Sequence, residues 1–193
     1  MKRLFVIIIL LGAVCVTCGC AQLGQVYYKK SQEFSFHPPA NWRYNPPEEE
    51  ITIFQSHHIK GYDFRPNLNV VMEDTELMAD EDYMDRQKDA LKKLPGYEEL
   101  AQDSVGNFDA WRLTYNFFNP HFKETPLTAV CQLMLRDTRI YVATYIAPEK
   151  LWRKYENMFC DSLDTFKFGE EAIPPGYKDT YTKPELATPE KLK

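Results

Sequence analysis

The chain has 193 residues, of which 26% are charged and 44% are hydrophobic, and its net charge at pH 7 is −5. Without its first twenty residues it holds 21 basic and 28 acidic side chains, which gives a net charge of −7. A surface this acidic argues against nucleic acid or an anionic membrane surface as a direct partner. The length leaves room for one domain with its own hydrophobic core.

The first twenty residues have the pattern of an export signal. Lys2 and Arg3 precede an apolar run at 4–16, which is shorter than the roughly 18 residues that a transmembrane helix needs. Residues 17–20, TCGC, resemble a bacterial lipobox in which Cys20 follows a glycine. The resemblance implies that the Cys20 thiol receives a diacylglycerol and that the chain carries palmitate.

Two routes of export follow from this segment. Lipidation of Cys20 anchors the protein to a membrane of the bacterial cell envelope through its N-terminal lipid. Because Ala21, and not Asp, follows the cysteine, the outer membrane is the expected destination if the source has one. Cleavage after Ala21 by an ordinary signal peptidase is the alternative, and it gives soluble export.

The rest of the chain divides into three parts by composition. We expect a polar tether at 21–30, one folded domain at 31–168, and a disordered tail rich in Pro and Lys at 169–193. The domain holds Cys131 and Cys160. The oxidising compartment outside the cytoplasm permits a disulfide between them, and two buried thiols are the alternative.

Taken in chain order, the first half of the domain predicts three strands and a helix. Runs of aromatic and β-branched residues predict strands at 33–37, 51–57 and 67–73. Asp80 is expected to cap a helix that runs to about Leu94 and ends before Gly96.

The second half predicts a meander followed by a closing helix. Gly106-Asn107 and Asp137-Thr138 separate extended runs, as the turns of β-hairpins do. The run IYVATYI at 140–146 is apolar on both faces and is expected at the centre of the sheet. Pro148 is expected to begin a helix, and its apolar stripe comprises Leu151, Trp152, Tyr155, Phe159, Leu163 and Phe166.

These elements define an α+β domain. We expect a mainly antiparallel sheet of about six or seven strands, with helices packed on its faces as an αβα sandwich. The alternating positions Trp111, Tyr115, Phe117, Tyr141 and Tyr145 are expected to be core residues. A ligand cleft lined by these aromatic side chains is the alternative.

The order of elements, together with FSFHPPANW at 34–42 and NLNVVME at 67–73, is similar to the PsbP-like family and to the DcrB-like bacterial lipoproteins. The resemblance covers most of 33–168, and Pro39 and Trp42 match the family's P-x-x-W stretch. It implies an αβα sandwich without a common enzymatic activity, in proteins that serve as accessory or assembly factors at membranes. It does not carry over a photosynthetic role, or the Ran-binding activity of a eukaryotic relative.

The candidate chemistry of the chain is sparse. His57 and His58 are adjacent, and neighbouring residues of a strand point to opposite faces, so we expect solvated loop histidines and not a metal site. We find no G-x-S-x-G motif, phosphate-binding glycine loop or Cys–His nucleophile pair. The sequence therefore suggests no catalytic residues and no cofactor.

One loop stands out as a candidate docking site. Phe118, Pro120, His121 and Phe122 lie between two predicted strands, where exposed aromatic side chains suit a protein partner. The alternative is that they fold back as a lid over the sheet. The hypothesis is a non-catalytic, lipid-anchored envelope protein that binds another protein or assists its assembly. A small-ligand or metal carrier, and an enzyme with an unrecognised site, are the alternatives.

Overall fold

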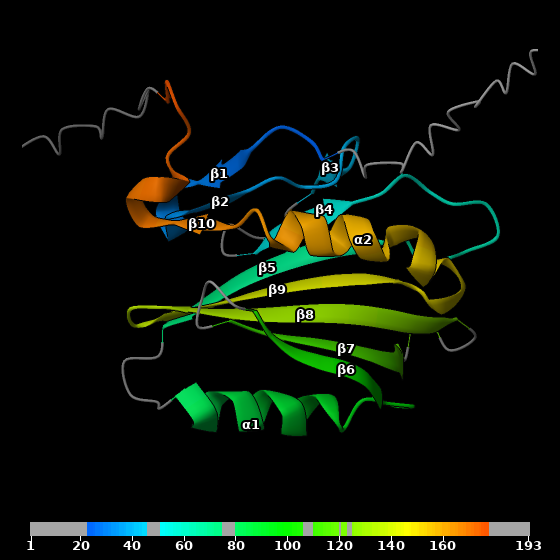
Figure 1. Cartoon of the computed structure of the whole chain (residues 1–193). Coiled ribbons are helices and arrows are strands. Elements are labelled where there is room, and N and C mark those ends of the chain that lie inside the picture. The colour runs from blue at the N-terminus through cyan, green and yellow to red at the C-terminus, as the bar shows by residue number, and fades with distance from the viewer. Residues whose placement is uncertain are drawn as a thin grey trace, which may run out of the picture.

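A seven-stranded antiparallel sheet forms the centre of the molecule (Figure 1). The computed structural model describes residues 23–45, 51–74, 80–105, 110–119, 121–122 and 125–177, with the backbone alone at 80–82. The order of the strands in this sheet is β3-β4-β5-β9-β8-β7-β6. The strands are β3 (Arg43–Tyr44), β4 (Thr52–Gln55), β5 (Asn67–Asp74), β6 (Glu98–Val105), β7 (Ala110–Phe118), β8 (Pro126–Arg136) and β9 (Arg139–Pro148).

The predicted meander is confirmed. β6 pairs with β7 and β8 pairs with β9, both antiparallel. Arg136 lies opposite Arg139, so Asp137 and Thr138 form the two-residue turn, and Asp137 adopts the positive φ of 52° that such turns require. The Gly106-Asn107 turn lies outside the described residues. β9 carries the apolar run IYVATYI between β5 and β8, in the middle of the sheet.

A second, three-stranded sheet was not predicted. It has the order β1-β2-β10 and consists of β1 (Tyr27–Lys29), β2 (Phe34–Phe36) and β10 (Lys167–Phe168). β2 lies between the other two strands and pairs antiparallel with both. The first and last strands of the domain therefore meet on β2.

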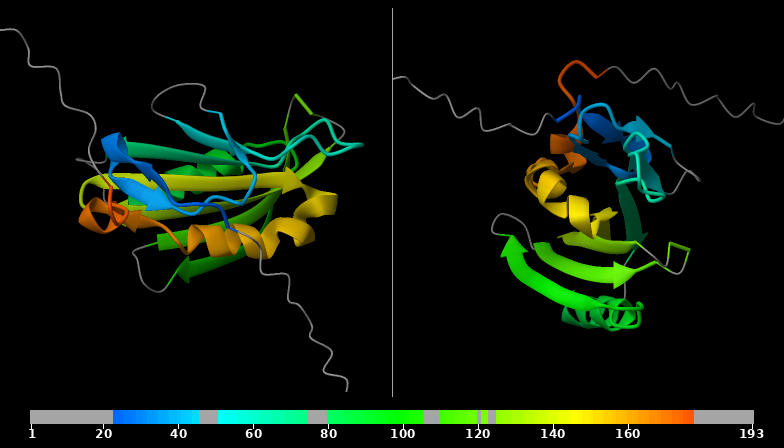
Figure 2. Two further views of the ribbon diagram at one scale, coloured as in Figure 1. Left: turned by 90° about the horizontal axis from the view of Figure 1, so that it is seen from above. Right: turned by 90° about the vertical axis from the view of Figure 1, so that its right-hand side faces the viewer.

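Two helices complete the layers (Figure 2). α2 (Trp152–Leu163) and the three-stranded sheet cover one face of the large sheet, and α1 (Asp80–Leu91) covers the other. Short 3-10 segments precede β2 and α2 and follow β10: η1 (Lys30–Gln32), η2 (Glu149–Leu151) and η3 (Gly169–Ala172). The α+β sandwich of the sequence prediction is confirmed. No helix within the described ranges is long and apolar enough to cross a membrane.

Three boundaries of the predicted helices were wrong. The closing helix α2 ends at Leu163, so Phe166 lies beyond it. Pro148 ends β9, where it lies opposite Leu127, and the α-helix begins only at Trp152, after the 3-10 turn η2. α1 ends at Leu91, and Leu94 donates instead to the Leu91 carbonyl in a tighter turn.

The folded unit extends beyond 31–168 at both ends, which corrects the predicted tether and tail. Residues 27–29 are strand β1, and Leu23 forms an isolated bridge with Pro39. At the other end, Ala172 is fully buried, and the Tyr177 ring meets the Tyr28 ring at 5.0 Å. Residues 1–22, with the predicted signal and Cys20, and residues 178–193 lie outside the described part.

Each face of the large sheet has its own core. On the α2 face, rings from the two sheets and from the segment after α2 pack together, and Phe36 and Phe166 stack at 4.6 Å with their planes 6° apart. On the α1 face, the buried alternate positions of β7 are Trp111, Leu113, Tyr115 and Phe117, as the sequence predicted.

Candidate functional site

The predicted docking residues lie at one end of the large sheet, where β7 ends and β8 begins. Phe118 is the last residue of β7, and its N–H donates to the Pro95 carbonyl at 2.7 Å. Its ring lies against Gly96, where an added Cβ would come within 2.2 Å of a ring atom. Phe118 is nevertheless 39% exposed. An aromatic side chain is thus both fixed by its neighbours and open to solvent.

The rest of this loop behaves differently from residue to residue. Phe122 is half-buried and packs edge-on against Phe64, with 5.4 Å between ring centroids, as the lid alternative predicted. His121 is exposed, and its backbone N–H donates to the Asn119 side-chain oxygen at 2.9 Å. Pro120 lies outside the described residues. Phe118 and His121 are therefore the two predicted docking residues that the structure leaves open to a partner.

A shallow hollow lies at the same end of the sheet. It has a volume of about 230 Å³ and is lined by Gly61, Tyr62, Thr125, Pro126, Pro148 and Lys150. Pockets for drug-sized ligands usually hold roughly 300–1,000 Å³ and are largely enclosed. The hollow is smaller than that, and among its described lining residues Lys150 is the charged one.

The histidines do not converge on a common point. His57 and His58 are both exposed in the loop after β4, and the His37 ring makes a 2.9 Å hydrogen bond with the Gly24 carbonyl oxygen. Within the described ranges, no group of three His, Cys, Asp or Glu side chains is placed to hold a metal ion.

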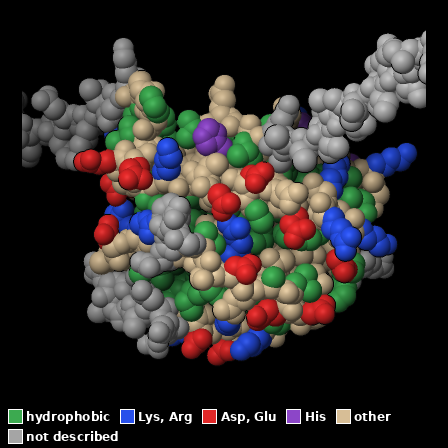
Figure 3. All heavy atoms as spheres, in the orientation of Figure 1, with side chains coloured by type: hydrophobic (Ala, Val, Ile, Leu, Met, Phe, Trp, Pro, Cys, Tyr) green, Lys and Arg blue, Asp and Glu red, His purple; other side chains and the backbone are tan. Residues whose placement is uncertain are grey.

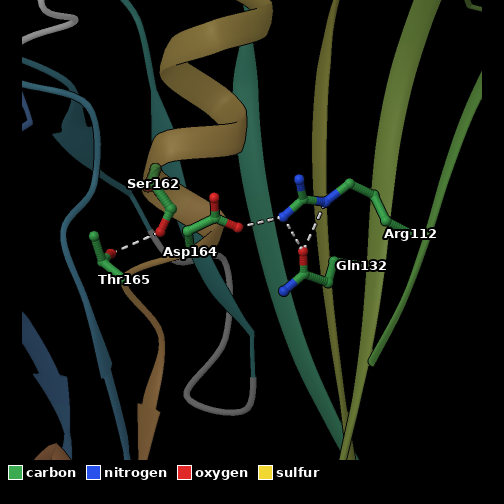
Figure 4. A network of polar contacts seen from close by, with 5 residues as sticks. All are labelled: Arg112, Gln132, Ser162, Asp164 and Thr165. Atoms are coloured by element: carbon green, nitrogen blue, oxygen red, sulfur yellow. Dashed lines mark hydrogen bonds and ion pairs between the residues drawn. The ribbon is translucent and has the colours of Figure 1, made fainter. Parts of the chain in front are cut away.

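A polar network that the sequence did not predict joins the large sheet to the end of α2 (Figure 4). Arg112 of β7 donates through Nε and Nη2 to Gln132 Oε1 of β8, at 2.9 and 2.6 Å, and through Nη2 to Asp164 Oδ1 at 2.6 Å. Gln132 is buried, and the Arg112 side chain is only 15% exposed. The guanidinium therefore lies beside the carboxyl end of α2, where positive charge is favourable.

A second set of hydrogen bonds joins the same end of α2 to the segment that follows β2. The Tyr145 hydroxyl donates to Ser162 Oγ at 2.5 Å, and Ser162 Oγ donates to the His37 carbonyl at 2.5 Å. Thr165 Oγ1 donates to the Ser162 carbonyl at 2.6 Å (Figure 4). Burial raises the pKa of Tyr145, so its hydroxyl stays protonated and donates at neutral pH. These groups hold α2 in place and have their partners within the fold.

The candidate disulfide between Cys131 and Cys160 was wrong, because both thiols are free. Cys131 belongs to the core on the α1 face of the sheet, whereas Cys160 is on α2, which packs on the other face. Burial raises the pKa of the Cys131 thiol to about 11. Burial also raises the pKa of Cys160, and the nearby Arg112 guanidinium opposes that rise.

Comparison with known proteins identifies the fold. No protein-family model and no curated protein sequence matches the chain. Among solved structures, the cyanobacterial PsbP (CyanoP) of Synechocystis sp. PCC 6803 superposes with a TM-score of 0.52 at 17% identity, over 82% of this chain and 98% of that one. The chain has a PsbP-like fold.

Two further structures share this PsbP-like fold. LpqN of Mycobacterium tuberculosis, which is involved in cell envelope biogenesis, gives a TM-score of 0.60 at 12% identity, over 75% of this chain and 91% of that one. The protein PA94 of Pseudomonas aeruginosa, of unknown function, gives a TM-score of 0.51 at 14% identity, over 81% of this chain and 99% of that one. At such identities the similarity shows the fold alone.

The P-x-x-W stretch has a structural role in this PsbP-like fold. The Trp42 N–H donates to the Pro39 carbonyl at 3.3 Å, which closes a turn after β2. The turn places the Trp42 ring 5.8 Å from Phe159 of α2 and 6.0 Å from Tyr145 of β9. Pro39 and Trp42 therefore fix the N-terminal segment to the core, and this structural role accounts for the P-x-x-W stretch without a ligand.

Proposed function

We propose that this chain is a lipid-anchored protein of the bacterial cell envelope that binds another protein or assists its assembly, and that it catalyses no reaction. The lipid is attached at Cys20, and Ala21 directs the anchored protein to the outer membrane where one exists. The partner is an envelope protein, and nucleic acid is not a partner.

The observation that carries the binding role is the placement of Phe118. Aromatic side chains that are held in one position before binding make strong contacts with a partner, because little conformational freedom is lost on association. Phe118 meets this condition through its contacts with Pro95 and Gly96, and His121 lies beside it in the same exposed loop. We call the exposed residues Phe118 and His121 the docking loop.

Two further observations support this proposal. The groups with reactive chemistry on the α2 face, such as Arg112 and Ser162, are engaged by Gln132, Asp164 and the His37 carbonyl. In addition, acidic and basic side chains are interspersed over the face that carries α2 (Figure 3). A surface of mixed charge suits a protein partner better than it suits a polyanion.

The anchor is tested by fractionation of cells that express the full chain or Cys20→Ala. The wild type is expected in the membrane fraction with incorporated labelled palmitate. The variant is expected in the soluble envelope fraction without label. Equal membrane partitioning of the two chains would show that Cys20 is not the lipid acceptor.

The docking loop is tested by site-specific photocrosslinking in intact cells. A photoreactive amino acid is placed at His121, and the matched control is placed at Lys154, an exposed position on α2. We expect a discrete adduct of constant mass from position 121 and none from 154, with the adduct identified by mass spectrometry. No adduct from 121, or the same adducts from both positions, would contradict the docking role.

A further inference from the structure

Exposed apolar side chains gather in the layer of the three-stranded sheet. Within the described ranges, the large hydrophobic residues with exposed side chains are Val26, Tyr44, Leu100, Phe118, Ile173 and Tyr177. Three of these six, Val26, Ile173 and Tyr177, belong to the segments that flank β1 and η3, in the upper layer of Figure 1. The Tyr177 ring packs edge-on against Tyr28 of β1, which ties the end of the described chain to this layer.

The start of the described chain is fixed to the same layer. Leu23 pairs with Pro39, and the Gly24 N–H donates to the Pro38 carbonyl at 2.6 Å. The His37 ring contacts the Gly24 carbonyl oxygen at 2.9 Å. Leu23 is therefore held by the turn that follows β2 and does not belong to a free tether.

The distance from the anchor to this layer is short. Cys20 precedes Leu23 by three residues in the sequence. A fully extended chain spans at most about 3.6 Å per residue, so the Cα atoms of Cys20 and Leu23 are at most about 11 Å apart. Since the acyl chains of a lipidated cysteine lie within the bilayer, the layer that holds Leu23 must remain next to the membrane surface.

We propose that the outer surface of the three-stranded sheet lies on the phospholipid bilayer that holds the Cys20 lipid. We call this surface the membrane-facing layer; its exposed apolar side chains are Val26, Ile173 and Tyr177. The inference rests on the lipid anchor of the proposed function and adds the orientation of the domain. Tyrosine side chains suit this position, because an apolar ring with a polar hydroxyl is stable at the boundary between lipid and water.

The lipid and the apolar side chains have separate roles in this arrangement. A few exposed apolar residues bind a membrane weakly by themselves, whereas a second contact beside an acyl anchor strengthens and orients the attachment. Exposed side chains of both signs lie on this layer, including Lys30, Lys167, Glu170 and Glu171. Charge therefore does not determine which surface faces the bilayer. The short chain between Cys20 and Leu23 and the exposed apolar side chains determine it. α1, on the far face of the large sheet, then points away from the bilayer (Figure 2).

The orientation is tested by fluorescence quenching on the lipidated full-length protein in vesicles of the zwitterionic lipids phosphatidylethanolamine and phosphatidylcholine. The Cys20 thiol is consumed by the lipid, Cys131 is buried, and Cys160 is replaced by serine. A single thiol is then introduced as Ile173→Cys or, in the control, as Lys93→Cys in the exposed turn after α1. Each thiol carries an environment-sensitive fluorophore, and the vesicles contain a lipid with a quencher in its upper acyl chain.

We expect the label at 173 to be quenched several-fold more strongly than the label at 93. Val26→Cys gives an independent second reading of the same surface. Flotation of the vesicles tests the lipid anchor separately from the orientation of the domain. A chain that does not float overturns the anchor and the orientation together. A chain that floats with equal quenching at 173 and 93, or with stronger quenching at 93, overturns the orientation alone. Shielding of 173 only after a soluble envelope extract is added would assign this surface to a protein partner and would also overturn the proposal.

Discussion

Phe159→Ala tests the junction between α2 and the two sheets. The Phe159 side chain is fully buried, and its ring stacks on Tyr145 of β9 at 4.3 Å. Three more rings surround it, from Trp42 at 5.8 Å, Trp152 at 5.5 Å and Tyr155 at 5.6 Å. Truncation to alanine would remove contacts on every side of the ring and leave a cavity that these neighbours fill only in part.

The expected loss of stability is large. Phe→Ala substitutions in cores cost about 3–5 kcal/mol, and each favourable ring pair contributes about 0.5–1.5 kcal/mol beyond its buried area. We therefore expect a value near the upper end, about 4–5 kcal/mol, against a typical domain stability of about 5–15 kcal/mol. With a urea m-value of about 2 kcal/mol/M, the midpoint of unfolding should fall by about 2 M.

The measurement is urea unfolding followed by tryptophan fluorescence and far-UV circular dichroism. Lys154→Ala is the control on the exposed side of the same helix. Its ammonium lies 5.5 Å from the Tyr155 ring centroid, so this change should cost under about 1 kcal/mol. A midpoint for Phe159→Ala within about 0.5 M of the control would show that the ring does not fill the core as described.

Three further outcomes are expected. Gly96→Ala should destabilise the fold by about 1–3 kcal/mol in urea unfolding, because Gly96 has a φ of +66° and its new Cβ would meet the Phe118 ring. Gly61→Ala, at a φ of +87° with open space around the Cβ, should cost less; equal costs would contradict the contact with Phe118. A chain ending at Gly169 should lose roughly 1–3 kcal/mol because it lacks the buried Ala172, whereas a chain ending at Tyr177 should keep the melting temperature of the full protein. In the folded, non-reduced mature protein at pH 8, iodoacetamide should not modify Cys131, whose pKa is about 11. After unfolding without a reductant, the intact mass should show that both Cys131 and Cys160 are alkylated. If both cysteines stay unmodified, the two residues form a disulfide.

The sequence predicted the parts of the fold whose periodicity is long. Alternation in β7 and the apolar run of β9 identified both strands, because a nine- or ten-residue strand repeats its pattern several times. The helical spacing of Trp152, Phe159 and Leu163 identified α2 for the same reason. β1, β3 and β10 were missed because two or three residues show no period, and their pairing depends on residues far away in the chain.

The alternation of side chains between the two faces of β8 explains why the disulfide prediction was wrong. Leu127, Ala129, Cys131 and Leu133 alternate along β8 and share the face of the α1 core. Val130 and Met134, between and beyond them, belong to the core under α2. A thiol on the first face cannot reach a helix on the second without passing through the sheet. The sequence contained this information, but it required knowledge of the face on which α2 packs.

The docking loop was predictable in location and not in detail. The sequence placed aromatic residues where two strands are joined, and Phe118 is the last residue of β7 while Phe122 lies between β7 and β8. The burial of Phe122 depends on Phe64, which comes from the loop between β4 and β5 and packs edge-on against its ring. The contact of Arg112 with Asp164 was not predicted, because the two residues are 52 positions apart in the chain.

The pairing of β2 with both β1 and β10 has a consequence for folding during synthesis. β2 lies near the start of the described chain, and it cannot bind β10 until residues 167–168 have been synthesised. The Ser162 hydroxyl and the His37 carbonyl, 125 positions apart, close the same junction. An emerging chain therefore lacks the strand that completes its first sheet for most of its synthesis. That delay lets the domain close only after the last strand has been synthesised.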